Sequence, residues 1–210
     1  MNDFSISMAL VDFIPVAFFA AAAVILMRDL YNKMSKGAFA LFSAGVINVT
    51  LAGALKALWK LLYAAGVCDF TALNAMFFPV QSIGFLLAGV GILAMLVHKQ
   101  VKNAALAVAP PVFSGTFVFV GLMVAGLGIM DAVLCILCAK LKKPWLIAIF
   151  AVSFVCSLGM GYLSSKDFAE AAMNWIAEGV NVVGQGTLLL GTVLLHKAGL
   201  ADLTLRGEEA

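Results

Sequence analysis

Six stretches of the chain are nearly free of charged residues, and each is long enough to cross a lipid bilayer as a helix. A hydrocarbon core about 30 Å thick needs roughly 20 apolar residues in helical conformation. The predicted spans are 8–27, 37–58, 73–97, 112–138, 145–163 and 172–195. The connections between them are short and hold most of the basic residues. The pattern therefore predicts an all-α integral membrane protein with six transmembrane helices.

Composition supports this class. Hydrophobic residues make up 64% of the 210 residues and charged residues only 11%, whereas soluble domains carry roughly a quarter charged residues. We expect a single transmembrane domain over 1–210, in which 196–210 is a short polar tail. The net charge of +2 gives no reason to expect nucleic acid as a partner. The expected location is the cell membrane, with the lipid bilayer as the first partner.

A weak repeat divides the chain into two three-helix halves, at about 8–97 and 112–195. Three short matches share an offset of 98 residues: Asp69-Phe70 with Asp167-Phe168, Phe77 with Trp175, and His98-Lys99 with His196-Lys197. Because three crossings reverse the direction of the chain, the second half would be inverted relative to the first. Six crossings would also return both termini to one face. Positive charges nearly balance across the two faces, and we expect the termini in the cytoplasm.

A polar stripe follows one face of the last predicted helix. Its members are Asn174, Glu178, Asn181 and Gln185, spaced i, i+4, i+7 and i+11, which places them on one side of a helix. Ionisable and amide side chains are costly at membrane depth, so such a stripe lines a cavity or pairs with neighbouring helices. We interpret it as a binding site. The alternative is interhelical hydrogen bonding together with an ion pair between Glu178 and a lysine.

Other polar residues extend a candidate path across the membrane. Gln81 follows Pro79, which has no N–H and frees a backbone carbonyl, and Asn74 and Trp175 complete the predicted solute-binding set. An ion pair or gate near the N-terminal face is predicted from Asp12, Lys56, Lys60 and Asp131, with Asp131 paired to one of the two lysines. In this arrangement Glu178 would lie nearer the opposite face.

Two families share features with the chain. The segment Ala177-Glu178-Gly179-Val180 resembles the last helix of the six-helix proton-gated urea and amide channels, although the first helix lacks the polar–glycine pair of that family. Six helices in a chain of this length are also similar to the substrate-binding subunits of energy-coupling-factor vitamin transporters. The first resemblance implies a channel with Glu178 in its path. The second implies a binding subunit that works with a partner protein.

The sequence favours a membrane channel or transporter for a small polar solute or ion. The alternative is a substrate-binding subunit or sensor that acts with a partner protein, and a third hypothesis is a thiol-redox enzyme using Cys135 and Cys138. The chain contains no motif that pairs a nucleophile with a base, so we expect no enzyme activity and no cofactor. His98 and His196 are predicted on opposite faces, so we expect no metal. Glycine-rich helix faces favour close packing, within the chain or in a homo-oligomer.

Overall fold

The computed structural model describes residues 5–97, 116–163 and 171–205, and all regular elements in these ranges are helical. The all-α prediction is confirmed. Within this part of the chain, five helical runs are long and apolar enough to cross a membrane: Ile6–Lys33, Lys36–Ala64, Thr71–Val97, Val118–Lys140 and Ala172–Lys197. A sixth apolar helix is shorter, so the predicted count of six spans is not confirmed. These helices indicate a membrane-embedded protein.

The first span is interrupted by a proline. It consists of α1 (Ile6–Val11) and α2 (Phe13–Leu30), with Asp12 between them. Pro15 has no N–H to donate to the carbonyl of Val11, and its ring crowds that carbonyl, so the helical hydrogen bonds break at this point. The break places an acidic side chain in the stretch from Ile6 to Met27, which has no other charged residue.

The third span is interrupted in the same way. It consists of α4 (Thr71–Ala75) and α5 (Phe77–Val97), and Met76 lies between them. Here Pro79 cannot donate to the carbonyl of Ala75. Two of the spans thus carry a proline-induced break close to their N-terminal ends.

The other helices are continuous. They are α3 (Lys36–Ala64), α6 (Thr116–Lys140), α7 (Leu146–Leu163) and α8 (Ala171–Lys197), with short 3-10 turns at Tyr31–Lys33 and Leu200–Asp202. Among the described residues, α2 packs against α3, α3 against α5, α5 against α6, α6 against α7, α7 against α8, and α8 against α2. These contacts arrange the six long helices in a closed ring.

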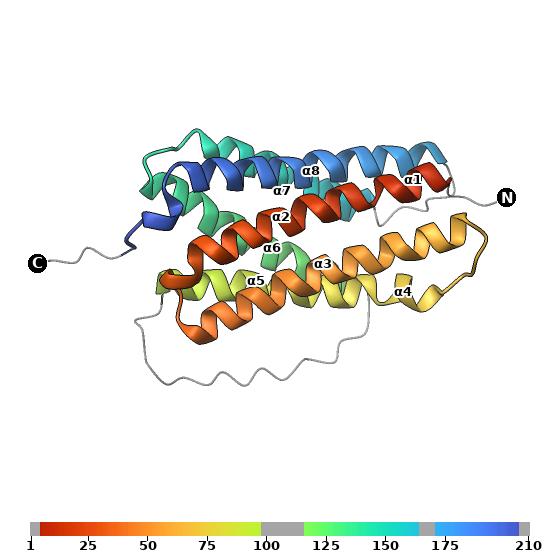
Figure 1. Cartoon of the computed structure of the whole chain (residues 1–210), viewed down its shortest axis with the longest axis horizontal. Helices are drawn as coiled ribbons and strands as arrows, with labels where there is room; N and C mark the ends of the chain where they lie inside the picture. The colour runs from red at the N-terminus through yellow and green to blue at the C-terminus, as the bar shows by residue number, and fades with distance from the viewer. Residues whose placement is uncertain (1–4, 98–115, 164–170, 206–210) are drawn as a thin grey trace, which may run out of the picture.

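The two halves of the chain run in the same direction. We call the end of the bundle where α1 begins the near end, and the end where α2 stops the far end. Both α5 and α6 run from the near end to the far end (Figure 1). Ion pairs place the start of α8 beside Asp12 at the near end, and place His196, close to the end of α8, beside Asp29 at the far end.

This direction differs from the prediction. The predicted inverted repeat is not confirmed, and the described chain begins and ends at opposite ends of the bundle (Figure 1). The prediction assumed that the connection after the third span returns to the same face. Residues 98–115 lie outside the described residues, but the helix ends that flank them lie at opposite ends of the bundle. Everything after α5 is therefore turned around relative to the prediction.

Glycines allow α3, α5 and α6 to approach closely, as the sequence predicts. A Cβ atom added at Gly45 would overlap the backbone of Ala88, and one at Gly126 would overlap the backbone of Phe85. Small residues permit such contacts in lipid, where packing and not water exclusion holds helices together. By contrast, a Cβ atom added at Gly121 would have no atom of the other described residues within 4 Å.

An apolar core fills the ring toward the far end. We call the following buried residues the apolar closure: Leu26, Leu30, Phe42, Ile92, Met130, Leu134 and Leu195. They come from α2, α3, α5, α6 and α8, and each belongs to the half of its helix that lies at the far end. The ring is therefore packed solid at this end.

Candidate functional site

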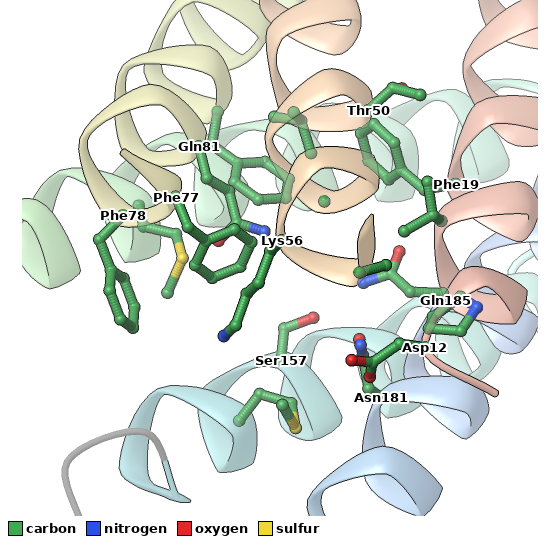
Figure 2. Close-up of a pocket in the computed structure, with 18 of the residues that line it drawn as sticks. Asp12, Phe19, Thr50, Lys56, Phe77, Phe78, Gln81, Ser157, Asn181 and Gln185 are labelled. Atoms are coloured by element: carbon green, nitrogen blue, oxygen red, sulfur yellow. The ribbon is translucent and has the colours of Figure 1, made fainter. Parts of the chain in front are cut away.

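A partly enclosed cavity of about 120 Å³ lies inside the near half of the ring, and side chains from all six long helices line it. Its polar lining consists of Asp12, Thr50, Lys56, Lys60, Gln81, Ser157, Glu178, Asn181 and Gln185 (Figure 2). A water molecule occupies about 30 Å³ of liquid. The cavity therefore has room for a few water molecules or for one small solute.

Three charged side chains meet at one side of the cavity. The Lys60 Nζ atom lies 2.5 Å from Asp12 Oδ2 and 3.0 Å from Glu178 Oε1. All three residues are buried. One ammonium group thus faces two carboxylates in a low-dielectric setting, where removing a single partner leaves an uncompensated charge.

The local sequence explains how this group forms. Asp12 occupies the break caused by Pro15, Lys60 lies near the end of α3, and Glu178 lies two turns into α8. Because α8 starts at the near end, Glu178 lies beside Asp12 and Lys60. The prediction that Glu178 lies near the opposite face is wrong, for the reason given above: the second half of the chain is turned around.

A second cation projects into the cavity from α3. Lys56 lies one turn before Lys60, and Figure 2 shows it extending toward the side of the cavity where Ser157 lies. Its Nζ atom lies 4.0 Å from the centre of the Phe77 ring and 5.7 Å from that of Phe78. Such cation–π contacts contribute about 0.5–2 kcal/mol. No carboxylate among the described residues lies within ion-pair distance of Lys56.

Two acceptor oxygens of cavity-lining residues have no donor in the part of the chain that the structure describes. Glu178 Oε2 and Gln185 Oε1 are buried and make no hydrogen bond with any described residue. A buried acceptor left without a donor costs about 1–3 kcal/mol. Asn181 and Gln81 add amide groups to the same lining. The cavity therefore offers both donors and acceptors to a guest.

The structure brings together most of the predicted site residues but not all of them. Six of the predicted residues line the cavity beside Glu178: Asp12, Lys56, Lys60, Gln81, Asn181 and Gln185. Asn174 is buried outside the cavity lining, Trp175 is 44% exposed, and Asn74 is exposed on α4.

Asp131 lies elsewhere. It is buried on α6, four residues beyond the cavity-lining Leu127 and toward the far end. The predicted pairing of Asp131 with Lys56 or Lys60 is wrong, because Lys60 pairs with Asp12 and Glu178 and Asp131 forms no ion pair with any described residue.

Sequence reasoning missed several lining residues. Ser157 on α7, Thr50 on α3 and the aromatic pair Phe77 and Phe78 carry no charge and match no motif. Thr50 and Ser157 donate their hydroxyl protons to carbonyls within their own helices, which is common for such residues in membrane helices. Thr50 and Lys56 are six residues apart, and residues at this spacing do not lie on the same face of a helix. The sequence therefore gave no reason to group Thr50 with Lys56.

A second polar cluster caps the far end. His196 Nδ1 lies 2.8 Å from Asp29 Oδ2, and Arg28 lies 3.0 Å from His196 Nε2 and 3.3 Å from Asp29 Oδ1. The prediction that His196 lies on the N-terminal face is wrong, again because α8 is turned around. Lys33 also donates to the carbonyl of Ala201 at this end, at 2.6 Å.

The remaining candidate groups lie apart from the cavity. Cys135 and Cys138 are both unbridged, and neither lines it. Among the described residues, no group of three or more histidine, cysteine, aspartate or glutamate side chains gathers in a way that could hold a metal ion.

Comparison with known proteins gives no indication of function, so the proposal below is based on the cavity. The chain matches no family model, no curated protein and no solved structure.

Proposed function

We propose that this protein moves a small polar solute across a membrane, with the near-end cavity as its binding site. The solute would receive hydrogen bonds from the Lys56 ammonium group and from the amides of Gln81 and Asn181. It would donate hydrogen bonds to the free oxygens of Glu178 and Gln185. The charges of Asp12, Glu178, Lys56 and Lys60 sum to zero when all are ionised, which favours a solute without net charge.

The observation that carries the proposal is a pair of buried acceptors, Glu178 Oε2 and Gln185 Oε1, that have no donor among the described residues and belong to the lining of a cavity formed by all six long helices. A buried ion pair is stabilised when further hydrogen bonds satisfy its remaining oxygen atoms, and Glu178 Oε2 has no such bond with any described residue. Acceptors of this kind fit a guest with N–H or O–H groups. Polar groups inside a membrane bundle commonly mark the path of a solute or ion.

The proposal includes a membrane arrangement. We take all six long helices to cross the bilayer, α7 included, since its 18 residues extend about 27 Å at 1.5 Å per residue. The two halves then form a parallel repeat around an axis along the membrane normal. Parallel repeats of this kind occur in transporters, with the substrate site between the two halves.

A binding subunit that delivers its ligand to a partner protein is the second candidate. The apolar closure favours it, because a cavity sealed at the far end can capture a solute without releasing it there. The two functions differ in one respect: a binding subunit binds solute but does not transport it when reconstituted alone.

Flux through proteoliposomes tests the proposal. Purified protein would be reconstituted, and the entry of urea, acetamide, glycerol and glycine followed by light scattering after rapid mixing. We expect at least one of these solutes to enter faster than into protein-free vesicles. The Glu178→Gln variant should reduce this rate to the protein-free level, because it removes a charged acceptor and alters the balance around Lys60.

The matched control is Asp69→Asn, which makes the same acid-to-amide change at an exposed position outside the cavity. It should transport like the unmodified protein. Equal flux in Glu178→Gln and Asp69→Asn, or no flux with any of the four solutes, would contradict the proposal. Binding of a solute to the purified protein without flux would support the second candidate.

A further inference from the structure

Asp131 is a buried acidic residue that does not line the cavity and forms no ion pair with any described residue. It is 6% exposed, and both of its carboxyl oxygens are buried and have no hydrogen-bond partner among the described residues. A carboxylate in such surroundings lacks the donors and counter-charges that stabilise its ionised form.

The surroundings of Asp131 contain almost no titratable groups. Its helix α6 packs against α5 and α7. The helix α5 has no acidic, basic, histidine, cysteine or tyrosine residue, and α7 has only Cys156 and Tyr162. On α6 itself the described titratable neighbours are Cys135, Cys138 and Lys140.

The position of Asp131 connects it with the cavity. The α6 residues that line the cavity include Val124 and Leu127, and Asp131 follows them at spacings of seven and four residues, on the same helix face. It lies about 6 Å farther along the axis than Leu127, at 1.5 Å per residue. Its neighbours Met130 and Leu134 belong to the apolar closure. Asp131 is therefore embedded in the structure that seals the far end.

We propose that Asp131 binds and releases a proton as the apolar closure forms and opens, and that this step couples solute movement to a proton gradient. The inference rests on the proposed transport function. While the closure is dry, Asp131 holds the proton as a neutral acid. When the closure opens to the far end, water reaches the side chain and accepts the proton, which leaves a carboxylate. The closure then cannot re-form until a proton returns to the carboxylate.

The chemistry of the site favours a proton over a metal cation. Hard cations such as Mg²⁺ or Ca²⁺ take six or more oxygen ligands. Asp131 has no polar partner among the described residues, and none of their acidic, histidine or cysteine side chains gather around it in a group of three. A single carboxylate can bind one proton without any other ligand.

Infrared spectroscopy of the full-length protein in lipid nanodiscs tests the proton site without any solute. At neutral pH the spectrum should contain the carbonyl stretch of a protonated carboxylic acid, and this band should disappear in Asp131→Asn. Asparagine has nearly the same shape as the neutral acid, so the fold should persist. The band should remain in the exposed control Asp69→Asn. A spectrum without the band, or one that is unchanged in Asp131→Asn, would overturn the proposal.

A second measurement needs no variant. The O–H of a protonated carboxyl group inside a membrane adds across a C=N bond of a hydrophobic carbodiimide, and mass spectrometry of the unmodified protein should locate the adduct on Asp131. If Asp131→Asn does not fold, carbodiimide labelling of the unmodified protein tests the proton site without the variant. Absence of an adduct on Asp131 would overturn the proposal.

The coupling is tested in proteoliposomes with any solute that shows flux in the assay above. In the unmodified protein, an imposed pH gradient should drive accumulation of that solute. In Asp131→Asn, the gradient should have no effect. If solute flux through the unmodified protein does not depend on the pH gradient, the proposed coupling is wrong, but the transport proposal is not affected. Loss of transport in every assay together with a confirmed infrared band would overturn the transport proposal and the coupling, while Asp131 would remain a proton site.

Discussion

The two ends of the helix ring place their charged residues in opposite ways. At the near end, Asp12, Lys60 and Glu178 point inward and lie beside a cavity. At the far end the interior is apolar apart from Asp131, and the buried carboxylate of Asp29 pairs with Arg28 and His196 at the rim, where the arginine side chain is 63% exposed. The same six helices thus build a hollow polar half and a solid apolar half. The position of polar residues along each helix, and not the number of helices, therefore determines which half of the ring is hollow.

The contrast also predicts how each end responds to mutation. When a buried charge loses its partner in a dry interior, no water molecule can take the place of that partner. At the rim the Arg28 and His196 side chains are 63% and 38% exposed, and ion pairs of exposed groups contribute little. We therefore expect substitutions at the near end to cost more stability than equivalent substitutions at the far end.

The largest effect is expected for Lys60→Met, which leaves two buried carboxylates without their shared cation. We expect a loss of about 3–5 kcal/mol in the free energy of unfolding, measured by denaturant unfolding in detergent. The matched control is Lys56→Met, one turn away on the same helix, which loses cation–π contacts with Phe77 and Phe78 but no ion pair of the described residues. The triple variant Asp12→Asn, Lys60→Met and Glu178→Gln should recover most of the loss. Equal stability of the Lys60→Met and Lys56→Met variants would contradict the picture of a buried charged group.

A smaller effect is expected for His196→Ala at the far end. Asp29 would lose one hydrogen bond but keep its contact with Arg28, so the loss in unfolding free energy should be roughly 1 kcal/mol. The same unfolding assay applies, with the exposed residue change Asp202→Asn as the control. If His196→Ala lowers the free energy of unfolding as much as Lys60→Met does, the expected difference between the two ends is wrong.

Much of the near end could be predicted from the sequence. The spacing of Glu178, Asn181 and Gln185 placed them on one inward-facing side of a helix, and they line the cavity. Asp12 and Lys60 were correctly expected at the same end of the bundle, because the first three spans run as the hydrophobic pattern suggests. These features depend on local periodicity, which a single sequence records well.

The direction of the second half could not be predicted in the same way. Hydrophobic spans show where helices lie, but the face to which a connection returns depends on the path of residues 98–115. Nearly balanced positive charges gave no independent test of that path. The error moved Glu178 to the wrong end and gave Asp131 a partner that it does not have. Uncharged lining residues such as Ser157 were missed because an isolated serine in an apolar helix carries no positional signal.

The most direct test of the account is the side from which the cavity can be reached. Three proteins would each carry one cysteine in a background without the other native cysteines: native Cys68, which is exposed near the end of α3, Ser157→Cys inside the cavity, and Lys142→Cys between α6 and α7. A charged, membrane-impermeant thiol reagent would be applied to vesicles of each orientation. We expect Cys68 and Ser157→Cys to react from one side of the membrane and Lys142→Cys from the other. Reaction of Cys68 and Lys142→Cys from the same side, or of Ser157→Cys only from the side of Lys142→Cys, would contradict it.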